Sequence, residues 1–361
     1  MQIGIVGLPY SGKTTFFQTL TETHFDPNVL QKKDVNQAII KVPDERLDKL
    51  TEIFNPKRKV NATIEIVDLV GIQKPEPGHS AFTTQFLSKV RTNDALIHVV
   101  RGFEDESVPH IEGSIDLLRD IKTFEEELIF SDMAFAESKL EKLEKDIQKQ
   151  KTKDQAIKEI SIIKKWNEVL SEGKALRELE FDPDEQKLIR NYQLLSAKPL
   201  LIALNLNESD IPQKDEIVKK ISSNFNGKNI RIEPFFAKIE MELAQLSDDE
   251  KAVFMEEYGL EDSAITRLIK SAYDLLGLQS FFTVGEDECR AWTIKKGMTA
   301  QESAGVIHTD FYNKFIRAEV VHYKEFLECG SFAKCKEKGY FRLEGKEYIV
   351  KDGDIMHIRH G

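Results

Sequence analysis

The residues Gly7-Leu8-Pro9-Tyr10-Ser11-Gly12-Lys13-Thr14 decide the fold of this chain. They follow a short apolar run, QIGIV at residues 2–6, and precede the helical pattern FFQTLTET. The form G-x-x-x-x-G-K-[ST] between a strand and a helix predicts a phosphate-binding loop, because its glycines let backbone N–H groups turn inward around an anion. The alternative is an ordinary glycine-rich turn. The residues that we expect to contact a nucleotide here are Gly7, Leu8, Pro9, Tyr10, Ser11, Gly12, Lys13, Thr14 and Thr15.

Two side chains of this loop have distinct expected roles. Lys13 places a positive charge on the β- and γ-phosphates, and the Thr14 hydroxyl is an oxygen ligand for Mg²⁺. We therefore expect Lys13 to be catalytic and Thr14 to bind metal.

Four further β-branched runs predict a parallel sheet. They span residues 62–71, 94–100, 200–207 and 230–237, and they alternate with helical patterns. Together with residues 2–6 they indicate an α/β fold with a doubly wound, mostly parallel sheet. We expect this nucleotide-binding domain to comprise residues 1–129 and 197–278.

Residues 130–196 are rich in Lys and Glu and carry almost no strand signal. Apolar residues recur at helical spacing in two arms, on either side of a predicted tip at 149–155, which predicts an inserted helical coiled-coil domain. A solvated hairpin and a binding arm are both open interpretations.

From residue 279 to 361 the pattern changes to short strands with turn signals, which predicts a separate β-rich domain. Its aromatic residues are interleaved with Lys and Arg, an arrangement that single-strand nucleic-acid binding can use, but we favour a packed core. We interpret His308 and Asp310 as residues that support the fold.

Composition limits the class of protein. The 361 residues are 40% hydrophobic and 31% charged, which is typical of a globular protein with two or three domains. No apolar run reaches the roughly 20 residues of a membrane span, and we expect no export signal ahead of the first strand. We expect a cytoplasmic protein with no membrane partner. Cys289, Cys329 and Cys335 fit reduced, buried thiols, and the net charge of −11 decides nothing about RNA.

The second predicted strand ends in Asp68-Leu69-Val70-Gly71, a D-x-x-G sequence. We expect Asp68 to hold Mg²⁺ through water and the Gly71 amide to meet the γ-phosphate. Ile72 follows, where Ras-like enzymes place a water-orienting glutamine. An aliphatic side chain cannot hold that water, so another group must do so.

Asn205-Leu206-Asn207-Glu208 closes the fourth predicted strand, where guanine-specific proteins carry N-K-x-D. Glu208 in place of aspartate weakens the case for GTP. We expect Asn205, Leu206 and Glu208 to lie at the base, together with the backbone of Ala237 after the fifth strand. The alternative is that Asn205 and Glu208 are ordinary polar residues at a strand end.

These motifs resemble the YchF or Obg-like ATPase family over nearly the whole chain. GLPYSGKTT resembles the family's phosphate loop, VPDERLDKL (42–50) its segment before the second strand, and NLNE its adenine-tolerant motif. Residues 290–320 and 344–357 resemble its β-grasp TGS domain. The resemblance implies a translation or stress-response factor that prefers ATP over GTP, hydrolyses it slowly and associates with ribosomes or ribosomal subunits. We expect it to act as a monomer.

The resemblance also supplies a candidate for the missing water-positioning group and marks three departures. The loop VRGFEDESVPHIEG aligns with one that carries a histidine proposed to act near the γ-phosphate, which is His110 here; a solvated loop histidine is the open alternative. Tyr10 replaces an asparagine linked to potassium, so we do not expect potassium activation. No Ser or Thr lies between His24 and Leu50 to complete a Mg²⁺ shell, and the segment after Gly71 has one glycine where the family has several.

Three functions remain open on the sequence alone. The first is a slow ATPase in which Lys13, Thr14 and Asp68 act electrostatically around Mg²⁺. The second is a nucleotide-gated ribosome- or RNA-binding module with vestigial hydrolysis, and the third is a GTP-preferring GTPase. A small-molecule P-loop kinase is disfavoured, because D-x-x-G and N-x-x-E both belong to switch-type triphosphatases.

Overall fold

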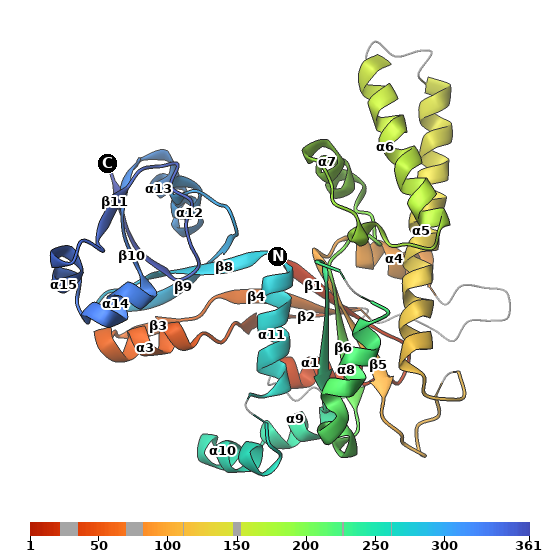
Figure 1. The fold of residues 1–361 in the computed structure, drawn as a ribbon, viewed down its shortest axis with the longest axis horizontal. Helices are drawn as coiled ribbons and strands as arrows, with labels where there is room; N and C mark the ends of the chain where they lie inside the picture. The colour runs from red at the N-terminus through yellow and green to blue at the C-terminus, as the bar shows by residue number, and fades with distance from the viewer. Residues whose placement is uncertain (22–34, 70–81, 111, 147–152, 226, 261) are drawn as a thin grey trace. The chain divides into compact units, whose positions relative to one another are not determined.

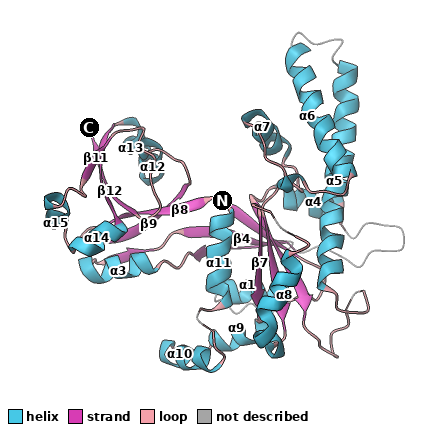
Figure 2. Cartoon of the chain, in the orientation of Figure 1, coloured by secondary structure: helices cyan, strands magenta, loops and turns pink. Residues whose placement is uncertain are grey.

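The computed structural model describes residues 1–21, 35–69, 82–110, 112–146, 153–225, 227–260 and 262–361. Its contacts divide the chain into two compact units. The first comprises Met1–Ala38 and Glu65–Leu268, and the second comprises Ile39–Ile64 and Ile269–Gly361. Each unit contains one of the two sheets that Figure 2 shows in magenta.

The sheet of the first unit has six strands in the order β2-β4-β1-β5-β6-β7. Strands β1, β4, β5, β6 and β7 pair in parallel, which confirms the predicted α/β fold. The sequence missed β2. The strands are β1 (Gln2–Val6), β2 (Val35–Lys41), β4 (Thr63–Leu69), β5 (Ala95–Gly102), β6 (Leu200–Leu206) and β7 (Ile230–Phe235).

Helices cover the sheet of the first unit and bury its apolar side chains. On one face, Ile121, Phe124 and Leu128 of α5 join a core with alternate residues of β4, β5 and β6. Elsewhere Phe16 of α1 packs edge-on against Phe235 of β7, with ring centroids 5.0 Å apart. The helices are α1 (Lys13–Thr21), α4 (Thr84–Arg91), α5 (Leu117–Asp146), α8 (Lys214–Ser222), α9 (Ala237–Leu243), α10 (Asp248–Glu257) and α11 (Ala264–Leu275), with the 3₁₀ helix η2 (Glu208–Gln213).

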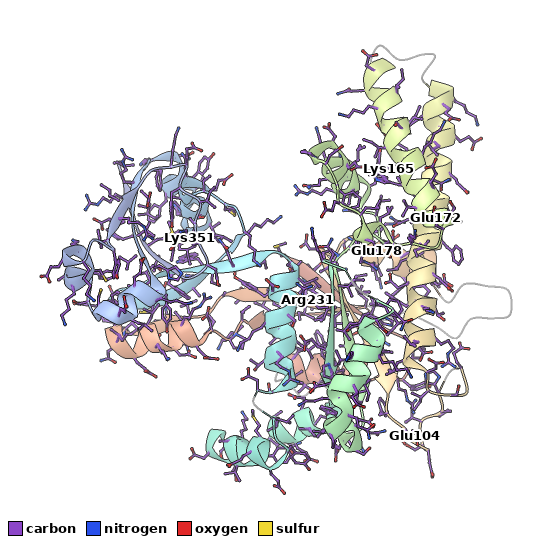
Figure 3. All side chains as sticks on the ribbon, viewed as in Figure 1. Glu104, Lys165, Glu172, Glu178, Arg231 and Lys351 are labelled. Atoms are coloured by element: carbon purple, nitrogen blue, oxygen red, sulfur yellow. The ribbon has the colours of Figure 1, made fainter. Side chains whose placement is uncertain are left out.

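The predicted helical insertion forms an arm of α5 and α6 (Lys153–Ser171), which run side by side in Figure 1. Trp166 is buried in its core. Lys139 pairs with Glu159 at 3.3 Å across the two helices. The 3₁₀ helix η1 (Leu176–Glu178) and α7 (Pro183–Tyr192) follow, and Figure 3 labels Lys165, which pairs with Glu185 of α7 at 2.7 Å. Helix α5 begins at Leu117, ahead of the expected boundary at 130, because one continuous helix serves both the sheet and the arm.

The second unit contains a sheet in the order β11-β10-β12-β8-β9-β3. Strands β8 and β9 form an antiparallel hairpin, β8 pairs in parallel with β12, and β12 pairs antiparallel with β10. With a helix between the hairpin and β10, this is the expected β-grasp topology. The elements are α3 (Glu45–Phe54), β3 (Arg58–Val60), β8 (Leu278–Thr283), β9 (Glu288–Lys295), α12 (Ala300–Ile307), α13 (Thr309–Asn313), β10 (Phe315–His322), α14 (Tyr323–Cys329), α15 (Phe332–Glu337), β11 (Arg342–Glu344) and β12 (Asp354–His360).

Several aromatic and aliphatic side chains of the second unit form a packed core. Phe281 and Ala318 are fully buried in its core, and Trp292 packs against that core. The ring nitrogen Nδ1 of His308 accepts the N–H of Asp310 at 3.2 Å and caps α13, as expected for a residue that supports the fold. The three cysteines are free and buried.

Residues 39–64 are the largest difference from the expected domain boundaries. The sequence assigned them to the nucleotide-binding domain, whereas in the structure they pack with the C-terminal residues. Strand β3 pairs in parallel with β9, and α3 buries Leu47 and Leu50. No local pattern in β3 or α3 specifies with which of the two sheets these elements pack, because that choice depends on partners far along the chain.

None of the helices in the described part of the chain has the length and the apolar character that crossing a membrane requires.

Candidate functional site

The predicted site residues meet at one edge of the first unit's sheet. The strands β1, β4, β5, β6 and β7 are parallel, so their carboxyl ends lie together, which is where ligands bind in open α/β sheets. The loop at residues 7–12 follows β1, Asp68 and Asn205 are the next-to-last residues of β4 and β6, and Ala237 begins the helix after β7.

The two glycines of the loop are required by geometry. Gly7 has φ +153°, and a Cβ there would lie 2.4 Å from the Val99 carbonyl oxygen. Gly12 has φ +94°, and its Cβ would lie 2.3 Å from the amide nitrogen of Asn205. Both values are below any normal carbon contact, so only glycine lets the loop pack this closely against β5 and β6.

Lys13 begins α1 and lies within the loop. Its ammonium donates to the carbonyl oxygens of Gly7 and Leu8, both at 2.8 Å. Burial lowers the pKa of Lys13 to about 8, although the nearby Asp68 carboxylate opposes that shift. A phosphate would favour the charged form, so the arrangement suits an anionic ligand.

Asp68 provides a carboxylate beside Lys13. Its side chain is 2% exposed, and among the described residues nothing donates a hydrogen bond to Oδ1. Burial raises its pKa, while Lys13 lowers it. Thr14 lies exposed at the first turn of α1. In phosphate-binding sites Mg²⁺ is held by oxygen ligands such as carboxylates and hydroxyls. The unpaired Asp68 Oδ1 and the Thr14 hydroxyl therefore fit such an ion.

Asn205 connects the loop to the end of β7. Its Nδ2 donates to the Ser11 carbonyl oxygen at 3.1 Å, and its Oδ1 accepts the Ala237 N–H at 3.3 Å. The side chain is buried. Its amide is therefore used within the protein, which makes Asn205 a residue that shapes the site.

The neighbours of Asn205 offer different surfaces. Leu206 is buried in the core, and Ala237 is half-buried. Glu208 begins η2 and is exposed. Glu208 therefore supplies the accessible polar side chain with which the N-x-x-E motif can contact a ligand.

Tyr10 lies at the tip of the loop. It adopts a left-handed conformation with φ +62°, and 63% of its surface is exposed. A side chain larger than glycine in this conformation carries a strain of about 1–2 kcal/mol. The phenol group lacks the amide oxygen that an asparagine would offer a cation.

His110 is not a solvated loop residue, because its side chain is only 7% exposed. Its Nε2 lies 2.9 Å from Asp120 Oδ2, and its Nδ1 accepts the Glu112 N–H at 3.1 Å. Arg119 Nε donates to the other oxygen of Asp120 at 2.9 Å. Both imidazole nitrogens thus have partners within the protein.

A narrow crevice joins His110 to the phosphate loop. Its walls are Leu8, Pro9 and Ser11 of the loop, residues 98–101 of β5, His110 and Asp120. Among the described residues, no partner reaches Ser11 Oγ, Arg101 Nη1 or either ring nitrogen of His98. Burial, with a smaller contribution from Lys13, lowers the pKa of His98 to about 3, so its ring is neutral.

Sequence reasoning missed Arg101, Phe103 and Asp120. Arg101 donates to the carbonyl oxygens of Phe103 at 3.1 Å and Val108 at 2.7 Å, which holds both ends of the loop that leads to His110. The available signal was a pair of polar residues, His98 and Arg101, within an apolar strand. Gly71 and Ile72 lie outside the described residues, so the expected roles of that segment remain predictions.

The parallel sheet carries a lysine-bearing phosphate loop after its first strand. A buried aspartate lies near the end of β4, and an asparagine on β6 binds the loop. Together these features define a P-loop nucleoside triphosphatase. The comparisons agree. Residues 2–165 match the MMR_HSR1 family, described as "50S ribosome-binding GTPase", and residues 278–361 match YchF-GTPase_C, described as "Protein of unknown function (DUF933)".

Relatives cover nearly the whole chain. The chain is 43% identical to the ribosome-binding ATPase YchF of Bacillus subtilis, over 99% of this chain and 98% of that protein. It is 35% identical to the Obg-like ATPase 1 of Caenorhabditis elegans, over 99% and 92%. The structure of the Schizosaccharomyces pombe YchF GTPase superposes with a TM-score of 0.87 at 32% identity, over 99% and 97%. The chain belongs to the YchF/Obg-like ATPase family.

Proposed function

We propose that this nucleoside triphosphatase hydrolyses ATP slowly to ADP and phosphate and uses the nucleotide state to control binding to a ribosomal particle. The observation that carries the proposal is the position of the Lys13 ammonium, held within the glycine loop beside Asp68. Such a loop catalyses mainly by positioning the phosphates and neutralising their charge.

The roles of the site residues follow from this arrangement. Backbone N–H groups of the loop bind the β- and γ-phosphates, and Lys13 transfers its hydrogen bonds from the Gly7 and Leu8 carbonyls to phosphate oxygens. Thr14 and Asp68 hold Mg²⁺, which supplies positive charge to the phosphates when bound. The contact of the Gly71 amide with the γ-phosphate remains a prediction, because Gly71 lies outside the described residues. The Tyr10 phenol lacks the amide oxygen with which an asparagine would bind potassium. Turnover in KCl should therefore equal turnover in NaCl, and a severalfold stimulation by potassium would contradict this.

Base selection is assigned to Glu208, with Leu206 and the Ala237 backbone at the base. Asn205 binds Ser11 and Ala237, which leaves Glu208 as the accessible carboxylate of the motif. The Glu208 carboxylate can accept a hydrogen bond from the exocyclic amino group of adenine. Its extra methylene, relative to aspartate, disturbs the geometry in which an aspartate accepts two hydrogen bonds from guanine. The relatives named as ATPases support the same choice. Calorimetry with ATP, GTP and their diphosphates tests it; tighter binding of GTP would contradict it.

The ribosomal partner is proposed from the relatives. The relative in Bacillus subtilis is named a ribosome-binding ATPase, and a cytoplasmic location for this chain follows if it binds the same kind of particle. We assign the binding surfaces to the helical arm (130–196) and the TGS-like domain (279–361), and we propose a monomer. Cosedimentation with purified 30S, 50S and 70S particles in ATP and ADP tests this. If the protein were absent from every ribosomal pellet in both ATP and ADP, the proposal would be contradicted.

We propose His110 as the group that positions the attacking water, in place of the missing glutamine. His110→Ala should slow single-turnover hydrolysis at least tenfold and leave nucleotide affinity unchanged. The competing function is a binding module with vestigial chemistry, and one observation favours it: both ring nitrogens of His110 are engaged. Single-turnover hydrolysis against a Lys13→Ala control separates the two, because a module without chemistry returns intact ATP.

A further inference from the structure

The hydrogen bonds of His110 determine its tautomer and its availability. Nδ1 accepts the N–H of Glu112 at 3.1 Å, so Nδ1 carries no proton. The proton of the neutral ring is then on Nε2, which lies 2.9 Å from Asp120 Oδ2 and donates to it. An imidazole has only these two hydrogen-bonding positions. In this arrangement neither nitrogen is left to hold a water molecule or a phosphate oxygen.

Asp120 is a strong partner for His110. Its side chain is 3% exposed, which keeps competing water away, and Arg119 donates to its other oxygen at 2.9 Å. A hydrogen bond to a buried carboxylate is charge-assisted and stronger than one between neutral groups. The pair therefore favours the position in which His110 is bound to Asp120.

His110 lies near the phosphate loop, within the narrow crevice described above. Arg101 holds the segment that leads to His110 through the Phe103 and Val108 carbonyls. His110 lines the same crevice as Leu8 and Pro9 of the phosphate loop, but the crevice is too narrow to admit a water molecule. Release of the ring toward the loop therefore requires the surrounding side chains to move as well.

We propose that Asp120 is a positioning residue that withholds His110 from the reaction, so that hydrolysis requires release of this histidine from the carboxylate. The inference rests on the proposed role of His110 in hydrolysis. Turnover is then proportional to the fraction of molecules in which the ring is released. Slow hydrolysis follows from the geometry of this pair, and a partner that separates the pair would accelerate it.

The experiment measures single-turnover ATP hydrolysis with Mg²⁺ on the full chain. Asp120→Ala should raise the rate about 10- to 150-fold, which is the range expected when one charge-assisted hydrogen bond is lost. Affinity for a non-hydrolysable ATP analogue should not change. Asp120→Asn keeps an acceptor for Nε2–H but removes the charge, and should give an intermediate rate. Asp116→Ala is the matched control, since Asp116 Oδ1 accepts the Arg119 N–H in the same first turn without contacting His110.

Double substitution separates this inference from the proposed function. His110→Ala with Asp120→Ala should hydrolyse at the rate of His110→Ala alone, because without the ring there is nothing to release. If His110→Ala alone leaves the rate unchanged, the proposed role of His110 fails and the inference with it. If His110→Ala slows hydrolysis but Asp120→Ala also slows it, only the inference fails, and Asp120 instead orients the ring for catalysis.

A second readout does not depend on activity. Nitrogen-15 spectra of the imidazole should report the Nε2–H tautomer for His110 in the unsubstituted chain and a tautomer mixture in Asp120→Ala, which removes the acceptor of Nε2–H. The same mixture in both would show that the carboxylate does not hold the ring. Circular dichroism confirms that each variant folds, and Asp120→Asn replaces Asp120→Ala if the latter does not.

Discussion

The amide nitrogen of Asn205 donates to the carbonyl oxygen of Ser11 at 3.1 Å, joining two residues 194 positions apart in the chain. The same side chain accepts the Ala237 N–H, so one buried amide fixes both the phosphate loop and the loop after β7. This position is the start of a motif usually read as base recognition. In this structure its direct role is to shape the loop.

Asn205→Ala should therefore lower the free energy of unfolding by about 1–3 kcal/mol, because it leaves a buried carbonyl and a buried N–H unpaired. It should also weaken nucleotide binding at least tenfold. Chemical denaturation and calorimetry measure the two effects. Asn207→Ala is the matched control, since Asn207 directly follows the same strand and is the N-cap of η2. Equal losses in both variants would show that the Asn205 contacts contribute nothing specific.

Gly12→Ala should abolish nucleotide binding and destabilise the first unit. A methyl group would lie 2.3 Å from the Asn205 amide, in addition to the cost of a positive φ. Gly173→Ala isolates that second cost, because Gly173 has φ +73° and its Cβ would meet nothing within 4 Å. We expect Gly173→Ala to lower the free energy of unfolding by about 1 kcal/mol, and Gly12→Ala to lower it clearly more. Thermal unfolding that shows similar losses would rule out the steric explanation.

Lys198 should make stability depend on pH. Its ammonium donates to the Arg91 and Asn93 carbonyl oxygens at the end of α4, and burial lowers its pKa to about 8 from 10.5, although Asp94 and Asp132 oppose the shift. Between those values the unfolded chain binds more protons than the folded chain. The free energy of unfolding should therefore rise with pH across that window.

Lys198→Met removes this titration. Below pH 8, the free energies of unfolding of the unsubstituted chain and the variant should differ by a constant amount. Between pH 8 and pH 10.5, this difference should shift in favour of the unsubstituted chain by at most about 3 kcal/mol. Urea denaturation across this range measures it. A flat difference would mean that Lys198 titrates at its ordinary pKa.

Arg46→Ala should destabilise the second unit by about 1 kcal/mol. Arg46 pairs with Asp352 at 2.7 Å and lies over the Phe282 ring at 5.2 Å, which joins α3 to the C-terminal residues. Lys57→Ala is the control, because its pair with Asp287 is 81% and 86% exposed and contributes little.

The chain has two tryptophans, Trp166 in the arm and Trp292 in the second unit. In a Trp166→Phe background, Trp292 fluorescence therefore reports on the second unit alone. If Arg46→Ala leaves the unfolding midpoint of the second unit unchanged, apolar contacts alone hold α3 in that unit.

Much of the first unit could be predicted because its signals are local. Strands β1, β5 and β6 appear in the sequence as largely apolar runs, since a strand buried on both faces needs apolar side chains along most of its length. Strand β2, at the edge of the sheet, has a mixed sequence and was missed. The start of α5 was misplaced because the helix continues from the sheet into the arm without a break in its pattern.

The sequence by itself determined the phosphate loop, the parallel sheet and a separate β-rich C-terminal domain, because glycine freedom and side-chain periodicity are properties of neighbouring residues. The β-grasp arrangement of that domain was expected only from the family resemblance. Tertiary structure decided that Asn205 binds Ser11, that β3 joins the C-terminal sheet, and that His110 meets Asp120. Each of these depends on which groups are brought together and sheltered from water. Hydrogen-bonding capacity can be read from a residue's name, but its partner is chosen only when the folded chain places donor and acceptor within reach.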